Sequence, residues 1–250
     1  MTGSGLRCKV MGIVNVTPDS FSDGGKFYAP EEATRRARRM IDEGADIVDV
    51  GGESTRPGAV PVAWEVEWER IEPVLRELSP FCAERGVAVS VDTYHPETAE
   101  RAVALGVSMI NCVYERSVPA MREICAGSDR ELVIPCRLPA AGQEPQATGP
   151  DPRVYLDPMI GFGTTREEDL ELLRSIPELA KAGRVLVGAS RKRIVKRLTG
   201  EKVPGKDLAG NLTIAVWAAL NGASVVRVHD VAETVQALKV LSALREGIAG

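Results

Sequence analysis

Short apolar, β-branched runs alternate with longer segments of helical periodicity along the whole chain. The apolar runs predict strands at residues 10–16, 46–50, 87–91, 108–110, 132–136, 153–156, 185–187 and 224–228. The periodic segments predict helices at 30–43, within 65–85, and at 96–105, 118–126, 167–182, 191–198, 208–220 and 231–246. Strands that alternate with helices in this way predict an α/β fold, a (β/α)8 TIM barrel, in preference to an open doubly wound sheet. We expect one domain over residues 1–250.

Two of the helical segments show which face we expect to be buried. The apolar positions of 30–43 are Ala33, Ala37, Met40 and Ile41, and those of 65–85 are Ile71, Val74, Leu75, Leu78 and Cys82. Both sets have the spacing of one helix face, which we expect to pack on the strands.

The alternation breaks between the fifth and sixth strands. Residues 138–152, LPAAGQEPQATGPDP, contain four prolines and two glycines. Proline removes a backbone donor and clashes with the preceding turn, so this segment cannot form a helix interior. We therefore expect the helix between these strands to be missing or replaced by a loop.

Composition excludes several classes of function. The net charge of -4 comes without a basic block, which argues against nucleic-acid binding, and aromatic residues are only 4% of the chain. The five cysteines are an odd number without a CxxC pair, which favours reduced thiols over disulfides or a zinc site. No apolar run reaches the length of a membrane span. We expect a cytoplasmic protein without nucleic-acid or membrane partners.

Polar side chains collect where the predicted strands end, which is the catalytic face of a barrel. Asp92, Asn111 and Asp157 end the third, fourth and sixth strands, each after apolar residues. One such residue alone is more often a cap or a buried hydrogen-bonding partner. Three together suit a flat heterocycle rich in N–H groups, such as an aminopyrimidinone, because a buried carboxylate is costly without donors.

Cationic and hydroxyl groups follow the last two strands. Ser190, Arg191 and Lys192 stand at a predicted helix start, where an anion is favoured, although a basic surface turn fits the same pattern. Strand alternation points Arg227 and His229 to one side, so both can bind one anion. His95, the other histidine, stands at a helix entry where capping or solvent exposure is sufficient.

The first two strand ends carry loops with possible ligand contacts. Residues 11–25, MGIVNVTPDSFSDGG, place Asn15 at the end of a strand, within reach of a ligand oxygen or a metal ion. The loop GGESTRPGAV offers the Thr55 hydroxyl and the Arg56 guanidinium. By spacing alone, an ordinary turn explains either loop.

Four sequence motifs favour ligand-binding loops over ordinary turns. NVTPDSFSDGG, GGESTRPGA, the Ser-Arg-Lys triplet and RVHDV together resemble the signatures of the dihydropteroate synthase family, and the resemblance covers nearly the whole chain. It implies a transferase of folate biosynthesis. This activity condenses 6-hydroxymethyl-7,8-dihydropterin pyrophosphate with p-aminobenzoate and yields 7,8-dihydropteroate and pyrophosphate.

The resemblance also implies roles for individual residues. Asp92, Asn111, Asp157 and Lys192 would bind the pterin; Asn15, Arg227 and His229 the pyrophosphate; and Thr55, Arg56 and Ser190 the p-aminobenzoate side. Lys192, Asp92 and Arg56 would be catalytic, and Asn15 would bind Mg2+. The loop with Asp19, Ser22, Asp23 and Gly24–Gly25 would close as a lid. A homodimer is implied, with the helix around Ile214, Ala215, Trp217 and Ala218 as its expected contact.

Three departures from the family's motifs leave two other functions possible. Cys112 stands where the family usually has Asp, residues 134–137 lack its Met-His-Met-like ending, and Thr164 replaces a common Lys. A pterin-binding paralogue without turnover fits these changes. A folate-binding methyltransferase domain that serves a corrinoid partner is also possible. Methyl transfer has no pyrophosphate to hold, so Asn15, Arg227 and His229 favour the synthase.

Overall fold

A computed structural model describes residues 8–17, 29–54, 59–136, 151–201, 203 and 206–246. The strands follow one another from β1 to β8 in a closed parallel barrel, which confirms the (β/α)8 fold class. The chain divides into two compact units, which we describe separately. The N-terminal unit is residues 12–134. The C-terminal unit contains the described residues from 135 onward together with residues 8–11.

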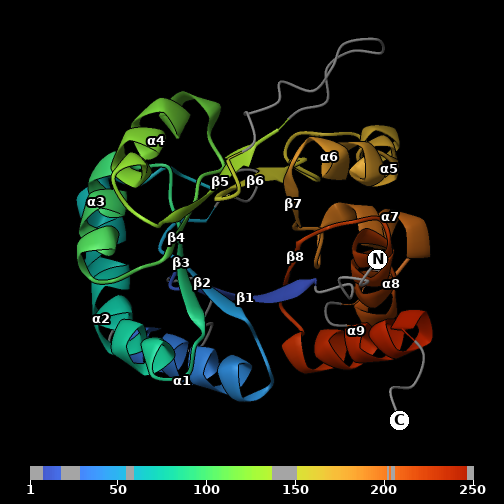
Figure 1. Ribbon diagram of the computed structural model, residues 1–250, viewed down its shortest axis with the longest axis horizontal. Helices are drawn as coiled ribbons and strands as arrows, with labels where there is room; N and C mark the ends of the chain where they lie inside the picture. The colour runs from blue at the N-terminus through green and yellow to red at the C-terminus, as the bar shows by residue number, and fades with distance from the viewer. Residues whose placement is uncertain are drawn as a thin grey trace. The chain divides into compact units, whose positions relative to one another are not determined.

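The N-terminal unit alternates strands and helices without interruption (Figure 1). Its elements are β1 (Lys9–Asn15, which begins in the other unit), α1 (Ala29–Asp42), β2 (Ile47–Gly51), α2 (Trp64–Ala83), β3 (Ala88–Asp92), α3 (Pro96–Ala104), β4 (Met109–Asn111), the 3-10 helix η2 (Glu115–Ser117), α4 (Val118–Ala126) and β5 (Glu131–Pro135). Helices α1 to α4 lie along the outer side of this unit's strands (Figure 1).

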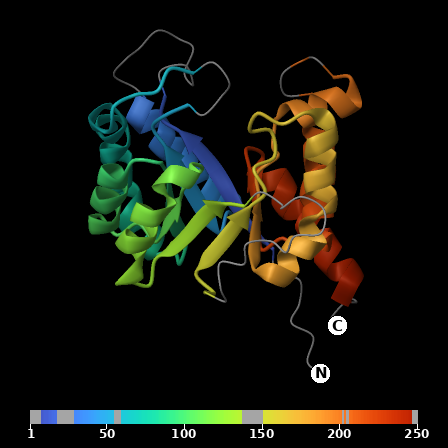
Figure 2. The ribbon, with the colours of Figure 1, turned by 90° about the horizontal axis from the view of Figure 1, so that it is seen from above.

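The C-terminal unit continues the same alternation. Its elements are β6 (Val154–Asp157), α5 (Arg166–Arg174), α6 (Ile176–Ala182), β7 (Arg184–Val187), α7 (Arg193–Thr199), α8 (Leu208–Leu220), β8 (Val225–Val228) and α9 (Val231–Glu246). Figure 2 shows the helices of this unit beside its strands from above. Residues 137–150, which contain most of the proline-rich segment, lie outside the described residues, so its expected loop stays a prediction.

The predicted helix faces are confirmed in the N-terminal unit. All four apolar positions of α1 are at most 8% exposed. The five expected positions of α2 are completely buried. Burial of a leucine or isoleucine side chain contributes about 1.5–3 kcal/mol, so these faces hold the helices on the strands.

The single helix predicted over 167–182 is wrong in one respect, because the structure has two helices there. α5 begins with a capping box between Thr165 and Glu168, and Ser175 is the C-cap that follows its last residue. The Ser175 hydroxyl donates to the Leu172 carbonyl oxygen at 2.8 Å. Pro177 then stands in the first turn of α6, the one place in a helix that does not need its missing N–H.

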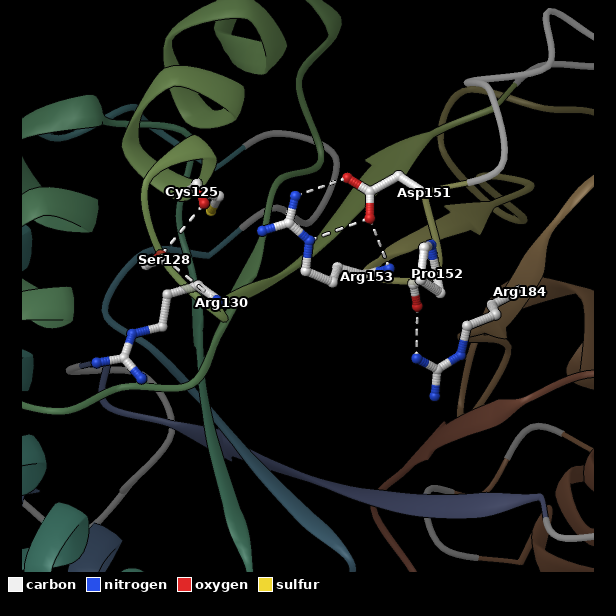
Figure 3. Close-up of polar contacts among 7 residues, drawn as sticks. All are labelled: Cys125, Ser128, Arg130, Asp151, Pro152, Arg153 and Arg184. Carbon is white, nitrogen blue, oxygen red and sulfur yellow. Dashed lines mark hydrogen bonds and ion pairs between the residues drawn. The ribbon is translucent and has the colours of Figure 1, made fainter.

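Local contacts hold the starts of β5 and β6, at the opposite strand ends from the polar residues singled out above (Figure 3). In the N-terminal unit, the Ser128 hydroxyl donates to Cys125 O and accepts from the Arg130 backbone N–H. In the C-terminal unit, Arg153 binds Asp151 through its guanidinium and its backbone N–H, at 2.9–3.1 Å. These short-range contacts fix the turns that precede the two strands.

Candidate active site

Parallel pairing aligns three strand ends in the N-terminal unit. Gly51 of β2 pairs with Asp92 of β3, and Asp92 pairs with Asn111 of β4. A Cβ atom added to Gly51 would lie 3.4 Å from the Asp92 Cβ, so the glycine leaves room for the carboxylate beside it. The structure therefore brings Asp92 and Asn111 together, as the sequence predicts.

Asp49 sets the orientation of the Asn111 amide. This aspartate lies inside β2, is completely buried, and accepts from Asn111 Nδ2 at 3.0 Å. Because Asp49 accepts, the amide oxygen of Asn111 faces away from it. That buried oxygen has no hydrogen-bond partner within the described chain. An unpaired buried acceptor is costly, which makes it a natural partner for an N–H group of a ligand.

A second polar cluster holds the chain where loop 2, residues 52–59, leaves β2. Glu53 accepts from the Tyr94 hydroxyl at 2.7 Å, and its second oxygen lies 3.4 Å from His95 Nε2. The Arg70 guanidinium donates to the Gly52 carbonyl oxygen at 2.7 Å. His95 thus lies against Glu53, and its side chain forms no helix cap, unlike the role considered from sequence. Thr55 and Arg56 of this loop lie outside the described residues.

Glu67 lies beneath the same cluster. It is completely buried and accepts from the Thr93 hydroxyl at 2.7 Å. Burial raises the pKa of this carboxyl, and the bond from Thr93 opposes the shift in part. The Thr93 hydroxyl oxygen also accepts from the His95 backbone N–H, so Glu67 and the start of α3 are connected through one side chain.

Gly52 has no room for a side chain. An added Cβ would lie 2.8 Å from Ile71 Cγ2 and 2.9 Å from the Glu67 carbonyl oxygen. We expect Gly52→Ala to lower the free energy of unfolding by about 1–3 kcal/mol, since backbone cannot move aside cheaply. Urea unfolding followed by circular dichroism measures this.

Gly127→Ala is the matched control, because its added Cβ meets nothing within 4 Å. We expect that control to stay within about 0.5 kcal/mol of the wild type. Equal stability of the two variants would contradict the tight fit at Gly52.

A buried carboxylate forms the centre of the site in the C-terminal unit. Asp157, the last residue of β6, accepts from the Met159 backbone N–H at 2.7 Å. Burial raises the pKa of the Asp157 carboxyl above its ordinary value, and the nearby cations Lys192 and Arg227 lower it in part. The structure therefore brings together three of the residues predicted from sequence.

Lys192 packs against the loop that follows β6. Its ammonium donates to the Ile160 carbonyl oxygen at 2.6 Å and lies 4.2 Å from the centre of the Phe162 ring. Gly161 makes this approach possible, because its φ is +78° and an added Cβ would lie 2.9 Å from Lys192 Cδ. The loop thus presents a backbone carbonyl and an aromatic face to the lysine.

Thr164, which departs from the family pattern, has a structural role in that loop. Its hydroxyl donates to Asp169 at 2.5 Å, and the Gly161 backbone N–H donates to the same carboxylate oxygen at 2.7 Å. Asp169 is almost completely buried on α5. These bonds hold Gly161 in place against Lys192.

The loops after β7 and β8 are bound to each other at two points. The Ser190 hydroxyl lies 3.1 Å from His229 Nδ1, and the Arg191 guanidinium pairs with Asp230 at 2.5 Å. Arg191 has a φ of +58°, and its backbone N–H donates to Asn211 Oδ1 at 2.9 Å. Two successive residues of one loop therefore contact two successive residues of the other.

Other predicted site residues are only partly described. Asn15 is the last residue of β1 and is half-buried. Of the expected lid, Thr17 to Gly25, only Thr17 is described, and residues 18–25 lie outside the described residues. Cys112, the departure after β4, is buried, and burial raises the pKa of its thiol to about 11. A thiol so raised stays protonated at neutral pH and is a poor nucleophile.

Comparison with known proteins shows the family of the chain. The family described as "Pterin binding enzyme" matches residues 11–146 and 138–229. Dihydropteroate synthase of Staphylococcus haemolyticus is 36% identical over 96% of both chains, and that of Mycobacterium leprae is 38% identical over 94% of this chain and 93% of its own. The chain belongs to the dihydropteroate synthase family.

Solved structures of the family agree with this assignment. Xanthomonas albilineans dihydropteroate synthase in complex with 7,8-dihydropteroate has a TM-score of 0.80 to this chain and is 35% identical. The same enzyme with 4-aminobenzoic acid has a TM-score of 0.82 and is 37% identical. In both, the match covers 96% of this chain and 94% of the other.

Several polar residues of the site were missed by sequence reasoning. They are Asp49, Glu53, Glu67, Tyr94 and Asp169. The role of Asp49 could have been predicted, because a carboxylate inside the apolar run IVDVG is expected to be buried and to need a hydrogen-bond donor. The others lie in helices or loops where an acidic or aromatic residue usually faces solvent, so the pattern gave no signal.

Proposed function

We propose that the protein condenses 6-hydroxymethyl-7,8-dihydropterin pyrophosphate with p-aminobenzoate to form 7,8-dihydropteroate and pyrophosphate. The observation that carries this proposal is the match, over nearly the full length of both chains, to a synthase in complex with 7,8-dihydropteroate. In this proposal, the described strand-end residues would supply part of the chemistry that the reaction needs.

The pterin is assigned to Asp92, Asn111, Asp157 and Lys192. The free Asn111 oxygen suits an N–H donor of the ring, as do the carboxylates of Asp92 and Asp157. Anionic carboxylates also favour positive charge that develops on the dihydropterin when its bond to pyrophosphate breaks. Lys192, held by Ile160 O, would bind an acceptor on the ring.

Departure of pyrophosphate is assigned to Arg227, His229 and Asn15. The bond between the pterin methylene carbon and the pyrophosphate oxygen breaks, and its electron pair leaves with the oxygen. The arylamine nitrogen then forms a bond to the methylene carbon and loses a proton. Donors and cations that neutralise the leaving anion lower this barrier, and no protein nucleophile is needed.

Mg2+ is the cofactor that the family implies. The described residues contain no cluster of three or more His, Cys, Asp or Glu that could hold a metal ion. Mg2+ commonly takes only one or two protein ligands together with substrate phosphates and water, so a single oxygen from Asn15 fits such a site. Bound there, the ion would neutralise charge on the departing pyrophosphate.

The p-aminobenzoate side is assigned to Ser190 with Thr55 and Arg56. Ser190 follows β7, two residues before Lys192. Arg56 can bind the benzoate carboxylate through two parallel N–H donors, a geometry that suits guanidinium groups. Arg56 also belongs to the catalytic set with Lys192 and Asp92, because it would hold the amine in position for attack.

The direct test is to incubate the purified protein with the pterin pyrophosphate, p-aminobenzoate and Mg2+, and to measure pyrophosphate release and dihydropteroate formation. We expect turnover that depends on both organic substrates. Omission of the arylamine is the matched control, since hydrolysis alone would also release pyrophosphate. Tight pterin binding without turnover would favour the non-catalytic paralogue.

We further propose a homodimer formed through α8 and α9. Ala215 and Ala218, two of the residues expected at the contact, are buried within their own unit and cannot reach a partner. Trp217, which was also expected at the contact, does face outward on α8. It is joined by Leu220 on α8 and by Val240 and Leu244 on α9, and the four side chains are 46–79% exposed. Large apolar side chains that are exposed on two helices packed against each other suit an interaction surface.

Leu244→Glu is expected to weaken this dimer by at least about tenfold in its dissociation constant, because a charge would be buried at the contact. Analytical ultracentrifugation measures the change. Val60→Glu, at a position 81% exposed in the N-terminal unit, is the control and should leave the association unchanged. A wild-type monomer at all concentrations would refute the proposal.

The cytoplasmic location stays a prediction. All five cysteines are free thiols, which is usual in a reducing compartment. No helix in the described parts of the chain is long and apolar enough to cross a membrane.

A further inference from the structure

Ser190 and His229 form two hydrogen bonds that connect the loops after β7 and β8. The Ser190 oxygen lies 3.1 Å from His229 Nδ1. The backbone N–H of His229 donates to that same oxygen at 3.2 Å. One lone pair of the hydroxyl is therefore occupied by the backbone, and the hydroxyl still has one proton to donate.

The His229 ring is the natural acceptor for that proton. Within the described residues, the hydrogen bonds of Ser190 Oγ are the two to His229, and His229 Nδ1 is the ring atom that faces the hydroxyl. A serine hydroxyl has one O–H donor, and a neutral imidazole has one donor nitrogen and one acceptor nitrogen. If Ser190 donates to Nδ1, the ring proton must be on Nε2.

The surrounding contacts keep this pair in place. Arg191 binds Asp230 through its guanidinium, and its backbone N–H is held by Asn211 Oδ1. The Ser190–His229 contact is therefore fixed by neighbours on both loops. We propose that Ser190 is a positioning residue that holds neutral His229 in the tautomer with its proton on Nε2.

The consequence for the reaction rests on the proposed function. Nε2 is on the side of the ring away from Ser190, so the histidine would present a donor N–H to the departing pyrophosphate in its neutral form as well as in its protonated form. With the proton on Nδ1, the same nitrogen would present a lone pair and repel the anion. Ser190 would thus support the leaving group through His229, in addition to its place on the p-aminobenzoate side.

Nuclear magnetic resonance can test the tautomer without any substrate. The chain has two histidines, so the long-range proton–nitrogen spectrum of 15N-histidine-labelled protein contains two rings, and His95→Gln assigns them. Well above the titration of the ring, we expect His229 Nδ1 to have the nitrogen shift of an unprotonated acceptor and Nε2 that of a protonated donor. A wild-type proton on Nδ1 would overturn the proposal.

Variants of Ser190 complete the test. Ser190→Ala should change the tautomer ratio of His229 by about tenfold, the value of one hydrogen bond, and Ser190→Thr should restore it. Ser175→Ala, at the end of α5, is the matched control and should leave the spectrum unchanged. A His229 spectrum that is the same in Ser190→Ala and the wild type would refute the positioning role.

The kinetic effect is measured separately. Ser190→Ala should lower kcat/KM for the pterin pyrophosphate by about tenfold, and Ser190→Thr should recover most of it. A wild-type protein with the expected tautomer and no pyrophosphate release would refute the proposed function while the positioning role stands. Turnover without the expected tautomer would refute the positioning role alone.

Discussion

Asp157→Asn is expected to lower kcat/KM by at least about 100-fold and, at neutral pH, to raise the free energy of unfolding. The activity falls because the amide cannot carry the negative charge proposed to stabilise the dihydropterin cation, and its NH2 group replaces an acceptor. Stability rises because burial, the largest influence on this carboxyl, disfavours its charged form. Steady-state kinetics and urea unfolding measure the two effects.

The pH dependence of stability follows from the sign of the shift. The folded-state pKa of Asp157 is raised above its ordinary value of 3.8. Below that ordinary value the carboxyl is protonated in both folded and unfolded protein, so aspartate and asparagine should give similar stability. As the pH rises through the raised pKa, the wild type loses stability that the variant keeps. The gap should therefore grow with pH and then level off.

The pH dependence of activity follows from the same shift. The proposed role requires the ionised carboxylate, so the acid limb of kcat/KM should lie at higher pH than an ordinary aspartate would give. Asp151→Asn, which changes a partly exposed ion pair with Arg153, is the matched control and should change neither activity nor the profile. Normal turnover of the Asp157→Asn variant would show that Asp157 is not part of the active site.

The fold could be predicted from the sequence because its strands and helices are short and have clear hydrophobic patterns. Buried parallel strands appear as continuous apolar runs, and every predicted strand lies within one residue of an observed one at each end. The ends of α8 and α9 were also predicted to the residue. The break between α5 and α6 was missed because a proline in the first turn of a helix and a proline inside one look alike in a sequence.

Site residues could be predicted from the sequence only where they directly follow a strand. Asp92, Asn111 and Asp157 were predicted because barrels place such residues at one edge. Their partners were not, since hydrogen bonds between distant segments depend on register and side-chain direction. Ser190 illustrates this: the resemblance placed it toward p-aminobenzoate, and the structure shows it bound to His229, 39 residues later.

Lys192→Ala is expected to lower kcat/KM by about 100-fold or more and, unlike Asp157→Asn, to lower the free energy of unfolding at neutral pH. The variant removes the ammonium that donates to the Ile160 carbonyl oxygen and that lowers the pKa of Asp157. The buried carboxylate is then left with less compensation, so its pKa should rise further. Lys181→Ala, an exposed lysine on α6, is the control.

The double variant Asp157→Asn/Lys192→Ala separates the effect of the Asp157–Lys192 interaction on stability from the effect of each residue alone. If Lys192 stabilises the protein mainly by compensating Asp157, its loss should cost much less stability when residue 157 is already Asn, because no buried charge remains. Turnover should stay as low as in the worse single variant, since both residues act on the same ring. An equal loss of stability from Lys192→Ala in the wild type and in the Asp157→Asn variant would show that Lys192 acts through Ile160 and Phe162 instead. Equal turnover of Lys192→Ala and the wild type would refute its catalytic role.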